Sequence, residues 1–235
     1  MSKPPLPDVV IPLGTGSWWQ DNELRYSLRS LHRHLPHGKV IVVGARPPWL
    51  RNVVHIPARD PHRFPSLNTM AKLRTALTSG EVGERFVLMN DDFFFLRDFD
   101  ELPVYHGGSL YVASKFKTSS YHGMAITSTW RLLAKRMSNA RLFDLHFPTC
   151  ADTDRALDIM DEVPRGTPFL FATLYHNRVG TRATKHADFK VRRAWKQPAP
   201  SCSFVSVDDG VVSDFEFRAW ARRTYPDPSP FEAPI

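Results

Sequence analysis

The sequence predicts an α/β protein with a mixed, mainly parallel sheet flanked by helices. Short apolar runs typical of buried strands alternate with segments whose apolar residues recur at helical spacing. Such alternation implies parallel pairing through crossover helices. The chain has 235 residues, of which 42% are hydrophobic and 23% charged. These values are average for globular proteins, so they exclude a largely disordered or fibrous chain and favour one compact domain over residues 1–235.

The first half of the chain carries the clearest strand and helix patterns. Four apolar runs are predicted to be strands, at residues 8–13, 39–44, 53–56 and 85–89. A first helix is predicted to begin after Asp21 and Asn22, because Leu24, Leu28 and Leu31 share one face. A second helix is predicted over residues 68–78, where Met70, Leu73 and Leu77 recur at helical spacing.

The second half of the chain is less regular. Helices are predicted at residues 124–137, 153–160 and 215–224. Residues 168–175 fit either a helix or a strand, because a short apolar run does not separate the two. Residues 185–200 are basic and polar, which indicates a loop or a flap.

The charge of the chain points to an anionic partner. Lys and Arg number 31 against 24 Asp and Glu, so the formal charge is +7. This excess favours a polyanionic partner or substrate, such as a nucleic acid, a nucleotide or an acidic polymer. No apolar run approaches the roughly 20 residues that span a bilayer, and the first residues lack the apolar core of a signal peptide. We therefore expect no membrane span and a cytoplasmic location.

An acidic pair follows the fourth predicted strand. Asn90, Asp91 and Asp92 stand where the carboxyl end of that strand is expected, and ligands of open α/β sheets bind at such ends. Adjacent carboxylates are hard oxygen ligands suited to Mg²⁺ or Mn²⁺ on a pyrophosphate. The alternative is a solvated turn. The aromatic run 93–95 favours a buried site, where carboxylates need a cation or hydrogen-bond donors.

Several other residues are candidates that spacing alone does not settle. The loop around Gly16 and Ser17 has glycines that let backbone amides approach a phosphate, although an ordinary tight turn explains it equally well. Arg25 lies on a basic helix face that is either solvated or positioned to clamp a phosphate. His146 is either a core histidine or a general base. Arg165 and His176 carry the same ambiguity. The pair Asp208–Asp209 follows another apolar stretch and fits either a turn or a second metal or substrate contact.

Taken in order, these motifs resemble the Stealth family of sugar-1-phosphate transferases. The resemblance covers nearly the whole chain, and its clearest part is the segment Asp-Asn-Glu-Leu-Arg-Tyr-Ser-Leu-Arg-Ser at residues 21–30. The remaining matching segments are residues 8–19, Pro48 to Leu50, Asn68, residues 90–95, His146 to Pro148, Arg165, residues 204–209 and residues 225–232.

The resemblance implies a GT-A-like fold, a UDP-sugar donor and a divalent metal, Mg²⁺ or Mn²⁺. Residues 1–100 would form the nucleotide-sugar-binding half, and residues 101–235 the acceptor and catalytic half. The resemblance implies donor binding by Gly16, Ser17, Arg25, Asn68 and Asn90. It implies metal ligation by Asp91, Asp92 and Asp209. It places the chemistry at Asp92, His146 and Arg165, with Asp92 or His146 as the base.

Three functional hypotheses follow. The first is transfer of sugar-1-phosphate from a UDP-sugar to a hydroxyl of a glycan acceptor, with release of UMP. The second is a GT-A-type glycosyltransferase, of a kind that would suit a phage, acting on a hydroxymethylated base in DNA and releasing UDP. It rests on the positive charge and on basic stretches with interleaved aromatic residues. The third is a non-catalytic module that binds a nucleotide or nucleic acid.

Overall fold

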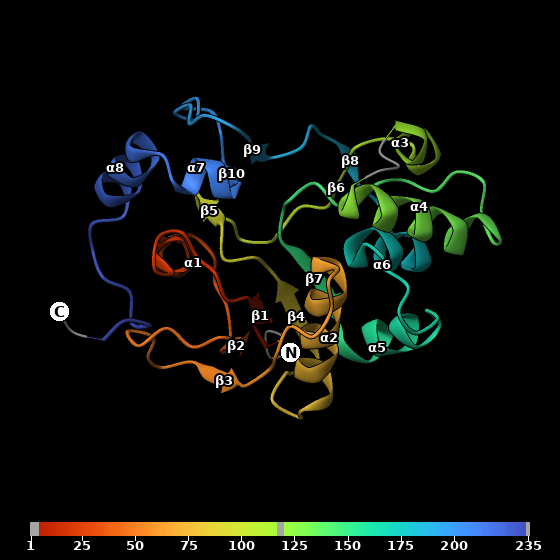
Figure 1. Cartoon of the computed structure of the whole chain (residues 1–235), viewed down its shortest axis with the longest axis horizontal. Helices are drawn as coiled ribbons and strands as arrows, with labels where there is room; N and C mark the ends of the chain where they lie inside the picture. Colours follow the sequence, from red (N-terminus) through yellow and green to blue (C-terminus); the bar gives the residue numbers. More distant parts are fainter. Residues whose placement is uncertain (1–4, 117–119, 234–235) are drawn as a thin grey trace.

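The computed structural model describes residues 5–116 and 120–233. Figure 1 shows the elements in chain order. The strands are β1 (Asp8–Leu13), β2 (Val40–Gly44), β3 (Val54–Ile56), β4 (Arg85–Leu88), β5 (Phe93–Phe95), β6 (Tyr105–His106), β7 (Thr149–Asp152), β8 (Thr184–Lys185), β9 (Lys190–Val191) and β10 (Phe204–Val207). The helices are α1 (Asn22–His34), α2 (Pro65–Thr78), α3 (Leu110–Phe116), α4 (Tyr121–Ala134), α5 (Thr153–Asp161), α6 (Phe171–Val179), α7 (Asp209–Val212) and α8 (Phe215–Thr224).

A five-stranded sheet forms the centre of the molecule. Its strand order is β3-β2-β1-β4-β7, and β1 pairs in parallel with both β2 and β4. Only the edge strand β7 runs antiparallel in this sheet. The prediction of a mixed, mainly parallel sheet flanked by helices is confirmed. A second sheet has the order β5-β10-β9, and β6 pairs with β8.

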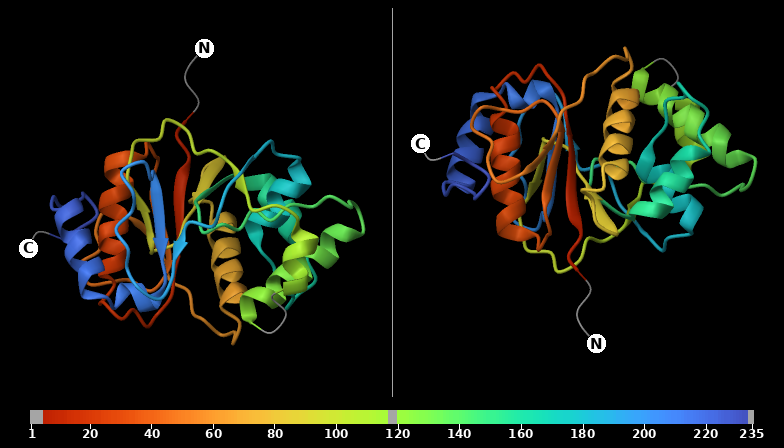
Figure 2. Two further views of the ribbon diagram at one scale, coloured as in Figure 1. Left: turned by 90° about the horizontal axis from the view of Figure 1, so that it is seen from above. Right: turned by 90° about the horizontal axis from the view of Figure 1, so that it is seen from below.

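Alternating side chains of β1 supply two separate cores, because neighbouring residues of a strand point to opposite faces. Val9 and Ile11 pack with the leucines of α1. Val10 packs on the other face with α2 and with residues of α4, α5 and α6. Figure 2 shows α1 and α8 on one side of the central sheet and α2 with α3–α6 on the other. Each fully buried leucine of α1 contributes about 1.5–3 kcal/mol.

Two serines attach the second sheet to α1. Ser27 Oγ donates to the Phe93 carbonyl at 2.7 Å, and the Phe95 amide donates to Ser30 Oγ at 3.1 Å. Both serines are fully buried. These bonds satisfy backbone groups of β5 and fix where its chain leaves the central sheet. The acidic pair lies in that connection from β4 to β5.

The segment after α8 is held against α1 by a buried ion pair. Arg29 Nη2 lies 2.6 Å from Glu232 Oε2, and the two side chains are only 7% and 3% exposed. Arg29 Nη1 also donates to the carbonyls of Tyr225 and Pro226. Figure 1 shows this last stretch running beside α1 toward β3.

Most predicted elements of the first half are confirmed within one residue at each end, although α2 begins three residues earlier than expected. Within the ambiguous segment 168–175, residues 171–175 belong to helix α6, which continues to Val179. Helix α4 lies three residues before its predicted place. Strand β7 was not predicted, since Thr-Cys-Ala-Asp carries no apolar pattern; its backbone pairing with β4 makes it a strand. The expected loop at 185–200 contains β9, which pairs with β10.

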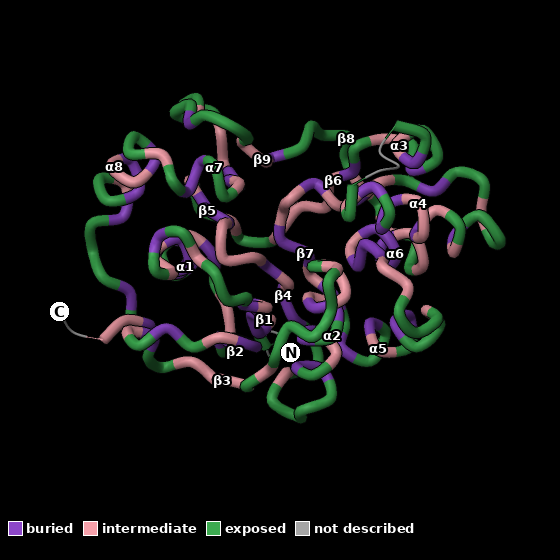
Figure 3. Tube along the Cα trace, viewed as in Figure 1, coloured by how far each residue is buried: buried purple, intermediate pink, exposed green. Residues whose placement is uncertain are grey.

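Burial follows the central sheet. Strands β1 and β2 are buried almost throughout, whereas the turn between β9 and β10 is largely exposed, as Figure 3 shows. Strand β7 from the second half of the chain pairs with β4, and β10 pairs with β5. Both halves of the chain therefore contribute to the central sheet and to the β5-β10-β9 sheet.

Candidate functional site

The chain changes direction between β1 and β4, and we call the region outside the carboxyl ends of these two strands the crevice. From β1 the chain builds outward through β2 and β3, then returns by α2 to β4 on the opposite side of β1. Open α/β sheets bind ligands outside the carboxyl ends of the strands at such a switch point. Here the crevice is bordered by the loop after β1, which holds Gly16 and Ser17, and by Asn90 to Asp92 after β4.

Asp92 forms an ion pair at this edge. Its Oδ2 accepts from Lys190 Nζ at 2.7 Å, and both side chains are 15% exposed. Its backbone carbonyl accepts from the Val207 amide of β10. Strands β9 and β10 therefore hold the second carboxylate of the acidic pair and bring a cation to it. The pairing of Lys190 with Asp92 was not predicted, because the two residues are 98 positions apart in the sequence.

Asp91 and Glu23 form an electrostatically unfavourable pair. The pKa of Asp91 is raised to about 8, mainly by burial and then by the charges of Asp92 and Glu23, while Lys190 opposes the shift. Glu23, in the first turn of α1, is 5% exposed. Its Oε2 has no hydrogen-bond partner among the described residues. Burial also raises the pKa of Glu23, although a hydrogen bond from Ser17 lowers it.

Sequence reasoning did not single out Glu23 as a site residue. The sequence could have indicated it, because Glu23 is an acidic residue within residues 21–30, the segment that most resembles the Stealth family. The charge of Asp209 also raises the pKa of Glu23, so the carboxyl of Glu23 is within electrostatic reach of both Asp91 and Asp209. The crevice therefore brings several carboxyl groups close together, and among the described residues Lys190 forms a direct ion pair with one of them, Asp92.

The expected metal ligands, as placed, do not fit a divalent cation. Asp92 is paired with Lys190, and Asp209 is exposed at the start of α7. Within residues 5–116 and 120–233, no group of three or more His, Cys, Asp or Glu is arranged to hold a metal ion. The other oxygen of the Asp92 carboxylate, Oδ1, accepts a hydrogen bond from Ser206 Oγ at 3.5 Å.

A cavity of about 220 Å³ lies beside the acidic pair. Asn90 and Phe93, which flank the pair in sequence, line it together with His146. His146 Nδ1 lies 2.9 Å from Asp188 Oδ1. Its backbone has φ 50°, a left-handed conformation that is uncommon for a residue other than glycine. The structure thus brings two of the predicted residues, Asn90 and His146, to one cavity.

The predicted donor-binding residues are only partly brought together. Gly16 has φ 109°, which glycine adopts without strain, so the turn there depends on it. Ser17 Oγ accepts from the amides of Trp19 and Asp21 at 3.1 and 2.7 Å, and so shapes the loop before α1. Both residues lie at the crevice, next to Glu23.

Arg25 and Asn68 are engaged elsewhere. Arg25 stacks over Trp49 at 4.7 Å and lies 3.6 Å from Glu232, on the other side of α1 from Glu23, because two residues along a helix differ by about 200°. The Asn68 amide donates to the His62 carbonyl and accepts from the His62 amide. Both polar atoms of the Asn68 side chain are therefore used to hold the backbone of the loop before α2.

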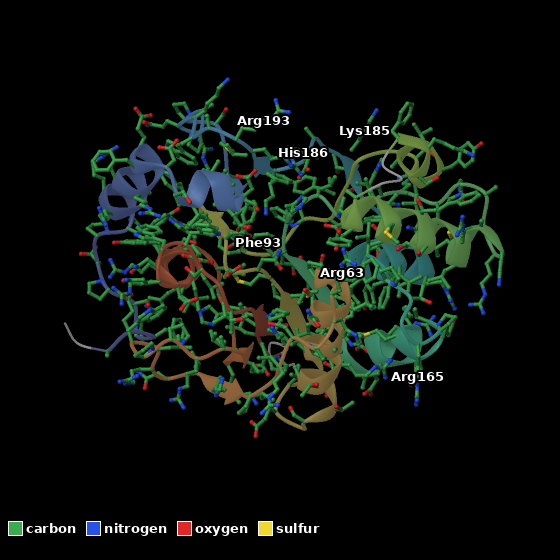
Figure 4. The ribbon with its side chains drawn as sticks, in the orientation of Figure 1. Arg63, Phe93, Arg165, Lys185, His186 and Arg193 are labelled. Atoms are coloured by element: carbon green, nitrogen blue, oxygen red, sulfur yellow. The ribbon has the colours of Figure 1, made fainter. Side chains whose placement is uncertain are left out.

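Arg165 and His176 lie away from the crevice. Arg165 is exposed in the turn after α5, and Figure 4 shows it at the outer edge of the molecule, far from Phe93. His176 is 4% exposed, and its Nδ1 lies 3.0 Å from Thr181 Oγ1. Burial lowers the pKa of His176 to about 4, so it is a neutral core histidine.

Several basic side chains lie around Phe93 in the view of Figure 4. Figure 4 shows Phe93 near the centre, Arg63 to one side, and Lys185, His186 and Arg193 above it. Among the described residues, none of these forms an ion pair with a carboxylate, although Arg63 donates to Tyr121 Oη at 2.9 Å. This edge of the molecule therefore carries positive charge that acidic side chains do not pair directly.

No protein-family model matches the chain, and no curated protein matches it. In the part of the chain that the structure describes, no helix has the length and apolarity needed to cross a membrane.

Proposed function

We propose that this protein is a GT-A-like transferase that moves sugar-1-phosphate from a UDP-sugar to a hydroxyl of a glycan acceptor. One observation carries the proposal. The acidic pair at the switch point lies beside a cavity that a carboxylate-held histidine, His146, also lines. A base next to a charged crevice is the arrangement that transfer to a hydroxyl requires.

His146 takes the proton in the proposed reaction. The acceptor oxygen attacks the β-phosphorus, and a new oxygen–phosphorus bond forms as the bond from this phosphorus to the bridging oxygen breaks. UMP leaves with that oxygen, and the proton of the acceptor hydroxyl passes to His146. Asp92 is the weaker candidate for the base, because Lys190 already occupies one of its oxygens.

Cations of β9 and of the chain segments on either side of it would neutralise the donor pyrophosphate. Lys190 lies at the acidic pair, and Arg193 and Lys185 lie along the same edge. Positive charge near a pyrophosphate lets an electron-rich oxygen approach phosphorus and stabilises the leaving group. The chain therefore offers its own cations where the resemblance implies a metal.

Identification of the nucleotide by-product tests the proposal. The protein is incubated with a panel of UDP-sugars and glycan acceptors, and the nucleotide released is identified by chromatography. Release of UMP is expected. Release of UDP would mean attack at the sugar carbon and would replace the proposal by an ordinary glycosyltransferase.

Two arms of this assay address the residues and the metal. The His146→Ala variant is expected to lose turnover by about 100- to 10,000-fold, the range of general-base contributions. Arg165→Ala serves as the matched control and is expected to keep turnover, because its side chain is exposed away from the cavity. Parallel reactions with Mg²⁺, with Mn²⁺ and with a chelator test the metal requirement that the resemblance implies.

A second candidate function is glycosylation of a hydroxymethylated base in DNA. Three basic side chains favour it, since Arg63, Lys185 and Arg193 have no carboxylate ion-pair partner among the described residues. Such side chains bind phosphates, and each contact makes affinity fall with salt. DNA binding that weakens steeply with salt, together with UDP release, would support this function; DNA binding that does not respond to salt would contradict it.

Two further expectations accompany the proposal. The non-catalytic alternative predicts nucleotide binding without turnover for every donor and acceptor tested. We also expect the protein in the cytoplasm, and fractionation of cells that express it tests the location.

A further inference from the structure

Asp188 makes three interactions that hold its carboxylate in one place. Oδ1 accepts from the Lys190 amide at 3.2 Å and lies 2.9 Å from His146 Nδ1. Oδ2 accepts from Arg192 Nη2 at 2.7 Å. Although burial raises the pKa of Asp188, the hydrogen bond from His146 and the charges of His146 and Arg192 lower it well below its usual range. Asp188 is therefore a carboxylate at neutral pH.

The backbone around this pair is also fixed. The Phe189 amide donates to the Leu145 carbonyl at 3.1 Å, and the Phe189 ring packs against Phe147 at 4.9 Å. The residues before and after His146 are thus joined to the residue after Asp188. This packing explains how His146 is held at φ 50°, since an uncommon backbone conformation persists where its surroundings determine it.

We propose that Asp188 is a positioning residue that keeps His146 in the tautomer required of a general base. A carboxylate only accepts hydrogen bonds, so the proton of neutral His146 sits on Nδ1. Nε2 is left with its lone pair and can take the proton of the acceptor hydroxyl. Asp188 also stabilises the imidazolium that forms in this step. The proposal rests on the proposed function, because it gives His146 the role of the base.

Other charged and titratable groups near His146 come from three segments. Asp144 lines the same cavity, and the His122 ring of α4 lies 5.9 Å from the His146 ring. Lys190 and Arg192 follow Asp188 on the β9 segment. Of these groups, Asp188 is the one with a hydrogen bond to His146 among the described contacts.

The first test is kinetic. The Asp188→Asn variant is expected to lower kcat by about 10- to 1,000-fold with little change in KM, because it alters the proton transfer rather than donor binding. The acidic limb of the pH–rate profile is expected to move to lower pH, since the negative charge that favours the protonated base is gone. An unchanged kcat or an unchanged limb would overturn the proposal.

Asp98→Asn is the matched control. Asp98 Oδ1 lies 2.7 Å from His34 Nδ1, so it forms the same kind of Asp–His pair, but its side chain is 88% exposed and its histidine does not line the cavity. This variant is expected to leave kcat and the pH–rate profile unchanged. A loss equal to that of Asp188→Asn would show that the effect is not specific to His146.

The second test does not need turnover. Nitrogen NMR of the imidazole reports which nitrogen of neutral His146 carries the proton. Protonated Nδ1 is expected in the wild type, and a shift toward protonated Nε2 is expected in Asp188→Ala. The same tautomer in both proteins would overturn the proposal. If no donor gives turnover, the proposed function fails, while this spectrum still decides whether Asp188 sets the tautomer.

Discussion

Replacing Asp91 with Asn should stabilise the folded protein, and the gain should grow as pH rises from 5 to 7. The pKa of Asp91 is raised from 3.8 to about 8, so between these values the folded protein holds a proton that the unfolded chain releases. Folding stability then falls as pH rises through this window, because the folded state binds more protons. Asn resembles the protonated carboxyl but does not titrate, so the substitution removes this residue's contribution to the fall of folding stability with pH.

The size of the effect follows from the shift. At about 1.4 kcal/mol per pH unit, Asp91→Asn should raise the free energy of unfolding by at most about 4 kcal/mol near pH 7 and about 2 kcal/mol near pH 5. Urea unfolding at several pH values measures both gains. Asp209→Asn is the control; its side chain is exposed, so its free energy of unfolding should change by less than about 0.5 kcal/mol. An Asp91→Asn variant no more stable than wild type at pH 7, or with the same gain at both pH values, would refute the reasoning.

Three further predictions concern stability. Glu232→Gln leaves the Arg29 charge buried without its partner, and we expect the free energy of unfolding in urea to fall by about 3–5 kcal/mol; a loss below about 1 kcal/mol contradicts this. The pKa of His176 is lowered to about 4, so as pH drops from 6.5 to 4 the unfolded chain binds a proton at this residue before the folded protein does, and folding stability falls. The stability of the His176→Gln variant, measured by circular dichroism during acid unfolding, should depend less on pH in this range. Asn68→Ala removes both hydrogen bonds to His62 and should cost about 1–3 kcal/mol with an unchanged donor KM, whereas a raised KM would support donor binding by Asn68.

Local patterns were enough to predict the central sheet. Strands β1, β2 and β4 are continuous apolar runs, as strands buried on both faces require. Because the strands are parallel, their carboxyl ends meet at one edge, and the acidic pair was therefore expected at the crevice. Strand β7 was missed since its polar sequence becomes a strand only through backbone pairing with β4.

The partners of the site residues could not be predicted in the same way. Lys190 and Asp188 lie in a segment that reads as a polar loop, and their contacts with Asp92 and His146 depend on how β9 docks on β10. The helix α1 poses a similar difficulty. Its periodicity places Glu23 and Arg25 on different sides, but only the packing of the second sheet shows which side faces the crevice.

Hydrogen exchange with and without a UDP-sugar most directly tests whether the donor binds in the crevice between β1 and β4. Protection is expected in residues 14–21 and 89–92, whose backbone borders the crevice, and in residues 144–147 beside the cavity. The exposed turn at 164–167 should exchange equally in both samples. Protection confined to other parts of the chain, or no protection by any UDP-sugar at saturating concentration, would contradict a donor site in this crevice.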